Sequence, residues 1–202
     1  MITRRLLLGS SLVLLALPAP MVPAWADATD AARGLIVQLG KQLTDVANGP
    51  GSAEERRAAL DKLVDAAVDV EAVARFCLGR FWRTATAEQQ RDYVKLFRAV
   101  LMRNITGKAG EYKGVAMDVG KAQPRESDVA VSSVVSRPGN APNKVDWIVG
   151  TASGAPRIID VVAEGTSLRL TQRSDYSAFL ASHNNDVQAL IEAMKAQAAA
   201  PG

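Results

Sequence analysis

Hydrophobic positions follow one period in the first half of the chain and another in the second half. Up to Gly107, apolar residues recur at intervals of three and four, which is the spacing of one face of an α-helix. The clearest run follows Thr86 and Gln89, a pair typical of a capping box at a helix N-terminus. The pattern predicts helices over residues 29–47, 52–66, 68–75 and 86–107.

From Gly114 onward the period is two, the period of a strand with one buried face. Short connections join antiparallel strands, because parallel strands need long crossovers. The predicted strands cover residues 115–119, 129–135, 145–149 and 159–163, and the turn-forming separators are residues 120–124, 138–143 and 153–154. Residues 175–199 return to helical spacing, with an interruption at Asn184 and Asn185.

Together these elements predict an α+β fold, in which helices cover a four-stranded antiparallel curved sheet. In the last strand, Ile159, Val161 and Ala163 share one face, and Asp160 lies on the other. We expect the helix that carries Phe97, Val100 and Leu101 to cover the apolar face. The interior would then be rich in Val and Ile, and it either closes as a core or stays open for an apolar guest.

The first 26 residues indicate export. Arg4 and Arg5 precede a largely apolar stretch, Leu6–Leu17, that is too short to cross a bilayer. Ala24-Trp25-Ala26 offers a cleavage site, and both the Sec and the twin-arginine route fit the sequence. We therefore expect a removed signal peptide over residues 1–26. The remaining residues, 27–202, form a single domain, mostly helical over 27–113, sheet over 114–165 and helical over 166–199.

Charge and cysteine content narrow the function. Cys77 is the only cysteine, so no intramolecular disulfide forms, and its apolar context predicts burial. Residues 75–113 hold 9 basic and 3 acidic side chains, a net of +6. This basic section either faces anionic lipid headgroups or an acidic partner, or it is a solvated helix face. Near-neutral overall charge and export disfavour nucleic acid as a partner.

Catalytic motifs are missing from the sequence. His183 is the only histidine, and neither a phosphate-binding glycine loop nor a G-x-S-x-G elbow occurs. Asp160 and Glu164 would stand about 13 Å apart on a strand, at roughly 3.3 Å per residue, which is too far for a paired-carboxylate mechanism. The sequence therefore predicts a binding protein rather than an enzyme, with no cofactor and no metal.

Two signatures resemble the MlaC (toluene-tolerance) family of periplasmic lipid-binding proteins. The first is Phe76–Arg83 followed by Thr86–Gln90, Tyr93 and Phe97. The second is an aspartate that closes the last strand, then Glu-Gly-x-Ser, then Arg-Ser-x-aromatic entering a helix. Here its members are Asp160, Glu164, Gly165, Ser167, Arg173, Ser174 and Tyr176.

The resemblance implies a nuclear-transport-factor-like fold with a helical N-terminal extension. It implies a periplasmic carrier, expected to be a monomer, that moves phospholipid between outer and inner membranes. Its partners would be an inner-membrane MCE-type ABC transporter complex and an outer-membrane lipoprotein complex, and its role would be to maintain outer-membrane lipid asymmetry. Two alternatives remain open: a hopanoid or other polycyclic lipid carrier of the HpnM-like branch, and a cargo-free accessory module that docks on the transporter.

The chain departs from the family pattern at three places. Ala155-Pro156 and Ile158-Ile159 stand where the family usually has aromatic residues, and Thr171-Gln172 replaces an Asn-Tyr pair. These departures concern the ligand more than the fold, and they keep the polycyclic alternative open.

Candidate site residues follow from both lines of reasoning. We expect Asp160 to accept hydrogen bonds from an arginine or from backbone groups, since an unpaired buried charge is costly. Ser174 and Asp175 would begin the next helix. Arg173 would pair with Asp160 or Glu164, or lie near a headgroup. The mouth or hinge candidates are Asp160, Glu164, Arg173 and Tyr176. The cavity candidates are Phe76, Phe81, Trp82, Leu96, Phe97, Val100, Leu101, Val131, Trp147, Val149, Ile159 and Val161.

Overall fold

A computed structural model of the chain describes residues 24–107, 113–152 and 154–200, so the predicted signal peptide lies largely outside the described residues. The first half is helical. In chain order its elements are α1 (Ala24–Asn48), α2 (Ala53–Ala67), α3 (Val70–Leu78), the short 3-10 helix η1 (Gly79–Arg83) and α4 (Ala87–Gly107).

The second half supplies the sheet and two further helices. Its elements are β1 (Ala116–Arg125), β2 (Asp128–Ser136), β3 (Asn143–Gly150), β4 (Arg157–Ala163), β5 (Thr166–Ser167), α5 (Leu168–Ser182) and α6 (Val187–Ala199). The strands pair in chain order, and every pair is antiparallel. The predicted α+β class and antiparallel meander are confirmed, with one short strand more than expected.

Local side-chain chemistry sets several element boundaries. The predicted capping box at α4 is present, with the Gln89 amide donating to Thr86 Oγ1 at 3.1 Å and the Thr86 amide donating to Gln89 Oε1 at 3.0 Å. Ser52 and Glu55 form a second capping box at α2. Gly79 ends α3 with a positive φ of 60°, which favours glycine.

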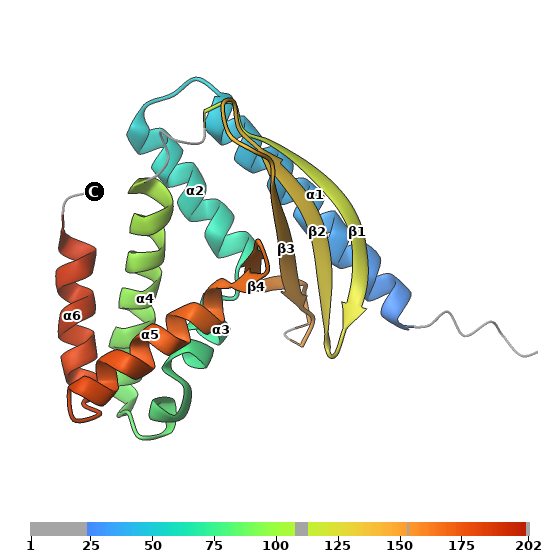
Figure 1. Cartoon of the computed structure of the whole chain (residues 1–202). Coiled ribbons are helices and arrows are strands. Elements are labelled where there is room, and N and C mark those ends of the chain that lie inside the picture. Colours follow the sequence, from blue (N-terminus) through green and yellow to red (C-terminus); the bar gives the residue numbers. More distant parts are fainter. Residues whose placement is uncertain (1–23, 108–112, 153, 201–202) are drawn as a thin grey trace, which may run out of the picture.

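Helix α1, not α4, covers the apolar face of the sheet (Figure 1). The expectation that α4 would lie there is wrong, because α4 packs instead on α6, α3 and α2. A helix that precedes the sheet by a long stretch of chain has no local signal for its partner. The sheet and α1 thus form one layer pair, and helices α3 to α6 form a separate helical part beside it (Figure 1).

Two main hydrophobic clusters result from this arrangement. In the sheet-side cluster, buried residues of α1, the end of α2 and strands β2 to β4 meet: Ala32, Ile36, Leu39, Ala67, Val129, Val131, Val149 and Ile158. In the helical cluster, residues of α3 to α6 and η1 meet: Ala74, Cys77, Leu78, Phe81, Tyr93, Phe97, Val100, Tyr176, Leu180, Val187, Leu190, Ile191 and Met194. A smaller cluster around Leu60, Val64 and Met102 lies where α2 meets α4.

A β-bulge in β4 changes the predicted face of one residue. Ile148 pairs with Asp160 and Val149 pairs with Ile158, so Ile159 is the extra residue. The bulge places Ile158, not Ile159, on the face that Val161 shares, whereas Asp160 lies opposite as predicted. Alternation alone cannot reveal a bulge, because the sequence on both sides of it still alternates.

Two further boundaries differ from the sequence-based expectation. Strand β1 continues through the glycine- and proline-containing residues 120–124, with a register shift between Val119 and Ala122. Helix α5 begins at Leu168 rather than near Asp175, because Ser167 Oγ accepts from the Leu170 amide at 3.1 Å and caps the helix there. The predicted interruption between the last two helices is confirmed, with positive φ at Asn184 and Asn185.

Candidate functional site

The apolar face of the sheet is lined by buried residues at its centre and partly covered residues at its edge. Val131 and Val149 are fully buried under α1, whereas Trp147 and Val161 are partly buried at the edge of the sheet-side cluster. The indole Nε1 of Trp147 donates to Ser133 Oγ at 2.9 Å, which fixes the ring on this face. Four of the twelve cavity candidates therefore meet on one surface.

Six other candidates lie in or against the helical cluster. Phe81, Phe97 and Val100 are buried members of it, and its partly buried neighbours include Phe76, Trp82 and Leu96. The mouth candidate Tyr176 is also buried there. Leu101 packs against the smaller α2–α4 cluster, and Ile159 is the bulge residue. The structure thus divides the candidates between two clusters instead of bringing them around one space.

The interior of the helical cluster is filled by aromatic rings. Tyr93 and Phe97 have ring centroids 6.0 Å apart, and the Tyr176 ring lies edge-on 6.0 Å from Tyr93 and 6.5 Å from Phe97. The Tyr93 hydroxyl donates to the Ala74 carbonyl at 3.0 Å. Burial raises the pKa of both tyrosine hydroxyls well above the usual range. These rings form a core that holds α3, α4 and α5 together.

Asp160 is a buried carboxylate at the junction of sheet and helices, with 7% of its surface exposed. As predicted, it accepts hydrogen bonds from backbone groups: the Val161 amide at 2.8 Å and the Arg169 amide at 3.1 Å. Ser167 Oγ also donates to it at 2.6 Å. Its ion-pair partner is Arg169, with 3.5 Å between Nε and Oδ2. The carboxylate therefore ties β4 to the first turn of α5.

Arg173 pairs with neither carboxylate in the described part of the chain, so the expected ion pair to Asp160 or Glu164 is wrong. Arg169 holds Asp160, and Glu164 Oε1 instead accepts from the Lys144 amide at 2.7 Å. The guanidinium of Arg173 lies over the Phe76 ring, 5.0 Å from its centroid. Arg169 also lies against that ring, at 4.4 Å. Sequence reasoning missed Arg169, since α5 was expected to begin later.

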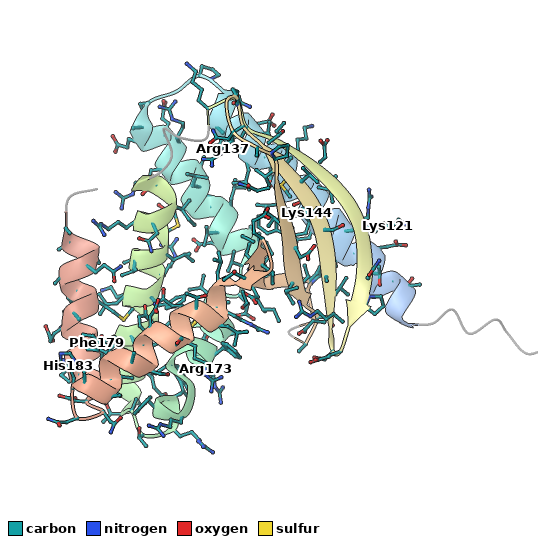
Figure 2. The ribbon with its side chains drawn as sticks, in the orientation of Figure 1. Lys121, Arg137, Lys144, Arg173, Phe179 and His183 are labelled. Atoms are coloured by element: carbon teal, nitrogen blue, oxygen red, sulfur yellow. The ribbon has the colours of Figure 1, made fainter. Side chains whose placement is uncertain are left out.

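An open hollow of about 550 Å³ lies where α3, η1 and α5 meet. We call it the arginine groove. It is lined by Ala72, Arg75, Phe76, Gly79, Arg80, Trp82, Arg83 and Arg173. Figure 2 shows Arg173 on the helical part of the molecule, on the side away from Lys121 on the sheet. A second open hollow of similar size lies between α1 and β1, and it mixes Asp30 with Arg33 and Lys121.

The single histidine and the single cysteine both make structural contacts. The His183 ring stacks on Phe179, with centroids 3.9 Å apart, at the end of α5 (Figure 2). Cys77 is 1% exposed, as predicted, and burial raises the pKa of its thiol to about 12. Among the residues that the structure describes, no group of three or more His, Cys, Asp or Glu side chains is placed to hold a metal ion.

No helix within the described ranges is both long and apolar enough to cross a membrane. A family model described as MlaC protein matches residues 35–196. The fold is similar to that of a phospholipid-binding protein from Ralstonia solanacearum, which was solved in complex with a phospholipid. The TM-score is 0.74 over 83% of this chain and 97% of that chain, at 20% sequence identity. At that identity the likeness shows a shared fold.

Proposed function

This chain belongs to the MlaC family, and on that premise we propose that it is a periplasmic lipid-binding protein that carries phospholipid between the outer and inner membranes. The observation that carries the proposal is the family match across nearly the whole folded region, residues 35–196. The structural neighbour that binds phospholipid supports the same reading through its fold. The predicted signal peptide is consistent with the location.

We place the acyl chains along the apolar face of the sheet, between β2–β4 and helices α1 and α2. Val131, Trp147 and Val161 contribute apolar side chains from three neighbouring strands. The helical cluster is a less suitable place, because its aromatic rings already pack edge to face around Tyr93. Lipid therefore enters by separating the sheet from α1 or α2, which replaces side-chain contacts with contacts to acyl chains.

The proposed role includes two partners, an inner-membrane MCE-type ABC transporter and an outer-membrane lipoprotein complex. A lipid carrier needs a donor and an acceptor for its lipid, and the family resemblance implies these two. The family match supports a binding role rather than a catalytic one.

A polycyclic lipid is the second candidate cargo. Ile158, where the family usually has an aromatic residue, is 3% exposed within the sheet-side cluster. An aliphatic side chain at this position leaves more volume beside Val149 and Ala67 than an aromatic ring does. A rigid, bulky guest would use that volume.

Native mass spectrometry of the protein purified after export tests the proposal, combined with organic extraction and identification of the lipid. We expect about one diacyl phospholipid per chain. If a polycyclic lipid is recovered from a host that makes one, the cargo is the second candidate and not phospholipid. A lipid-free mass that persists after incubation with phospholipid vesicles would refute the carrier role and leave the cargo-free docking module.

A further inference from the structure

The arginine groove gathers positive charge without a neutralising acid. Arg75, Arg80, Arg83 and Arg173 line it, and no carboxylate is among the lining residues. Within the described ranges, none of these four guanidinium groups forms an ion pair with Asp or Glu, whereas Arg98 pairs with two aspartates and Arg169 pairs with one. Four like charges around one hollow repel one another, and an anion removes that cost.

Aromatic rings hold three of these four arginines in place. Arg75 lies over the Trp82 ring at 5.6 Å, and Arg80 lies over the Phe81 ring at 4.8 Å. Arg173 and Arg169 both lie against Phe76, at 5.0 and 4.4 Å. A guanidinium held by a ring face keeps its N–H donors available at its edge, so these arginines can still bind phosphate oxygens in the fork geometry that suits them.

The helical cluster makes the groove rigid. Phe81, which supports Arg80, is 8% exposed and belongs to that cluster. Gly79 lets α5 come close: a Cβ at this position would lie 3.3 Å from Arg173 Nε, and its φ of 60° suits glycine. Segments 75–83 and 169–173, far apart in sequence, therefore present one surface.

We propose that the arginine groove binds the phosphate groups of anionic phospholipids at the surface of a bilayer. The groove is open rather than enclosed, which suits a headgroup that remains part of a membrane. Trp82 and Phe76 are partly buried at its wall, and aromatic side chains beside arginine favour the membrane–water interface. The proposal rests on the proposed function, because a lipid carrier has to approach a bilayer or a complex embedded in one.

Vesicle flotation with the exported full chain tests this surface. The probes are vesicles of phosphatidylglycerol, which is anionic, and of phosphatidylcholine, whose headgroup has no net charge. The test variant is Arg80→Glu/Arg83→Glu, two exposed residues of η1. The matched control is Lys121→Glu/Lys144→Glu, which changes the net charge equally on the sheet, away from the groove (Figure 2).

We expect the wild type to bind phosphatidylglycerol vesicles more tightly than phosphatidylcholine vesicles, with an affinity that falls as salt is added. Arg80→Glu/Arg83→Glu should weaken this binding more than about tenfold, because each basic residue near an anionic surface contributes measurably. The control should stay within about twofold. If the double variant does not fold, Arg83→Glu alone replaces it, with an expected loss of about threefold or more.

Three results of the vesicle experiment would overturn the proposal. The first is equal vesicle binding by the wild type and Arg80→Glu/Arg83→Glu. The second is an equal loss in the lysine control, which would mean that net charge alone drives binding. The third is a wild type that ignores phosphatidylglycerol vesicles but binds a poly-glutamate peptide through Arg80 and Arg83. That result would assign the groove to an acidic protein partner.

Lipid occupancy, measured by native mass spectrometry on the same samples, separates this proposal from the carrier role. We expect Arg80→Glu/Arg83→Glu to keep its copurified lipid. If the variant loses both its copurified lipid and its binding to vesicles, the bilayer assignment is overturned. The groove would then bind the headgroup of the carried lipid. If the wild type never holds lipid but binds vesicles through these arginines, the proposal for the groove is supported and the carrier role is refuted.

Discussion

Asp160 and Arg169 form a largely buried ion pair that joins the last long strand to the helix that follows it, with 3.5 Å between Oδ2 and Nε. The side chain of Asp160 is 5% exposed and that of Arg169 is 24% exposed. Because Arg169 also lies against Phe76, the pair connects β4, α5 and α3 at one point. The sheet and the helical part are therefore coupled through two charged side chains.

Replacing Asp160 with alanine should destabilise the protein by about 3 kcal/mol, since it leaves the Arg169 guanidinium without its carboxylate in a mostly buried site. It also removes the acceptor for Ser167 Oγ and for two backbone amides. Urea unfolding of the variant measures the change. A double-mutant cycle with Arg169→Ala measures the interaction energy between the two side chains. A coupling energy near zero would contradict a stabilising ion pair.

Placing a large ring at Val161 should exclude lipid. This residue lies on the covered face of the sheet beside Trp147, its cross-strand neighbour. We expect Val161→Trp to fold and to lower lipid occupancy by at least about half, because the ring occupies volume proposed for acyl chains. Native mass spectrometry of the purified variant gives the occupancy.

Val134→Trp is the matched control for that experiment. It introduces the same ring into the same sheet, but Val134 is 39% exposed and lies on the opposite face. Its occupancy should equal that of the wild type. Equal occupancy in Val161→Trp and the wild type, with both folded, would show that the acyl chains lie elsewhere.

The thiol of Cys77 should be inert while the protein is folded. Burial raises its pKa from 9.0 to about 12, an effect that the nearby Arg169 charge only partly opposes. At about pH 8 the thiolate fraction is then lower by a factor on the order of 10³, and the thiol is also inaccessible. Ellman's reagent should label the unfolded chain rapidly and the native chain hardly at all. Rapid labelling under native conditions would place Cys77 at the surface.

Stability should fall with acid in part through Glu55. The Ser52 amide donates to its carboxylate at 2.7 Å, and this hydrogen bond, with that to the Ser52 side chain, lowers the pKa of Glu55 below 4.5. A lowered pKa stabilises the folded state above the unfolded value, and this contribution is lost as the pH falls through the folded value. The stability difference between the wild type and Glu55→Gln should therefore shrink as the pH falls below 4.5. The midpoints of urea unfolding, measured for both proteins at a series of pH values, check this.

Local chemistry made most elements predictable from the sequence. The Thr86–Gln89 capping box and the interruption at Asn184 and Asn185 depend on residues within a few positions, and both are present. The identity of the helix that covers the sheet was not predictable in this way. Whether α1 or α4 lies on it depends on contacts between distant segments, and both helices carry an apolar face.

The charged site was predicted in part. Asp160 stood out because a carboxylate among isoleucines and valines needs donors, and it has them. Its arginine partner was missed, because Ser174 and Asp175 were expected to begin the next helix, whereas Ser167 caps that helix and Leu168 begins it. The groove was missed for a similar reason. Arg173 joins Arg75, Arg80 and Arg83 only through tertiary packing.

The bulge at Ile159 has a consequence for chain length. Removing this residue would leave Ile158 and Val161 on the covered face and Asp160 on the other, because Ile159 is the one residue that has no partner in β3. Deleting a residue away from the bulge, such as Val162, would leave no residue between Val161 and Ala163 and turn Ala163 to the opposite face. Strand β4 thus holds one position where the loss of a residue during evolution can be absorbed without exchanging its two faces.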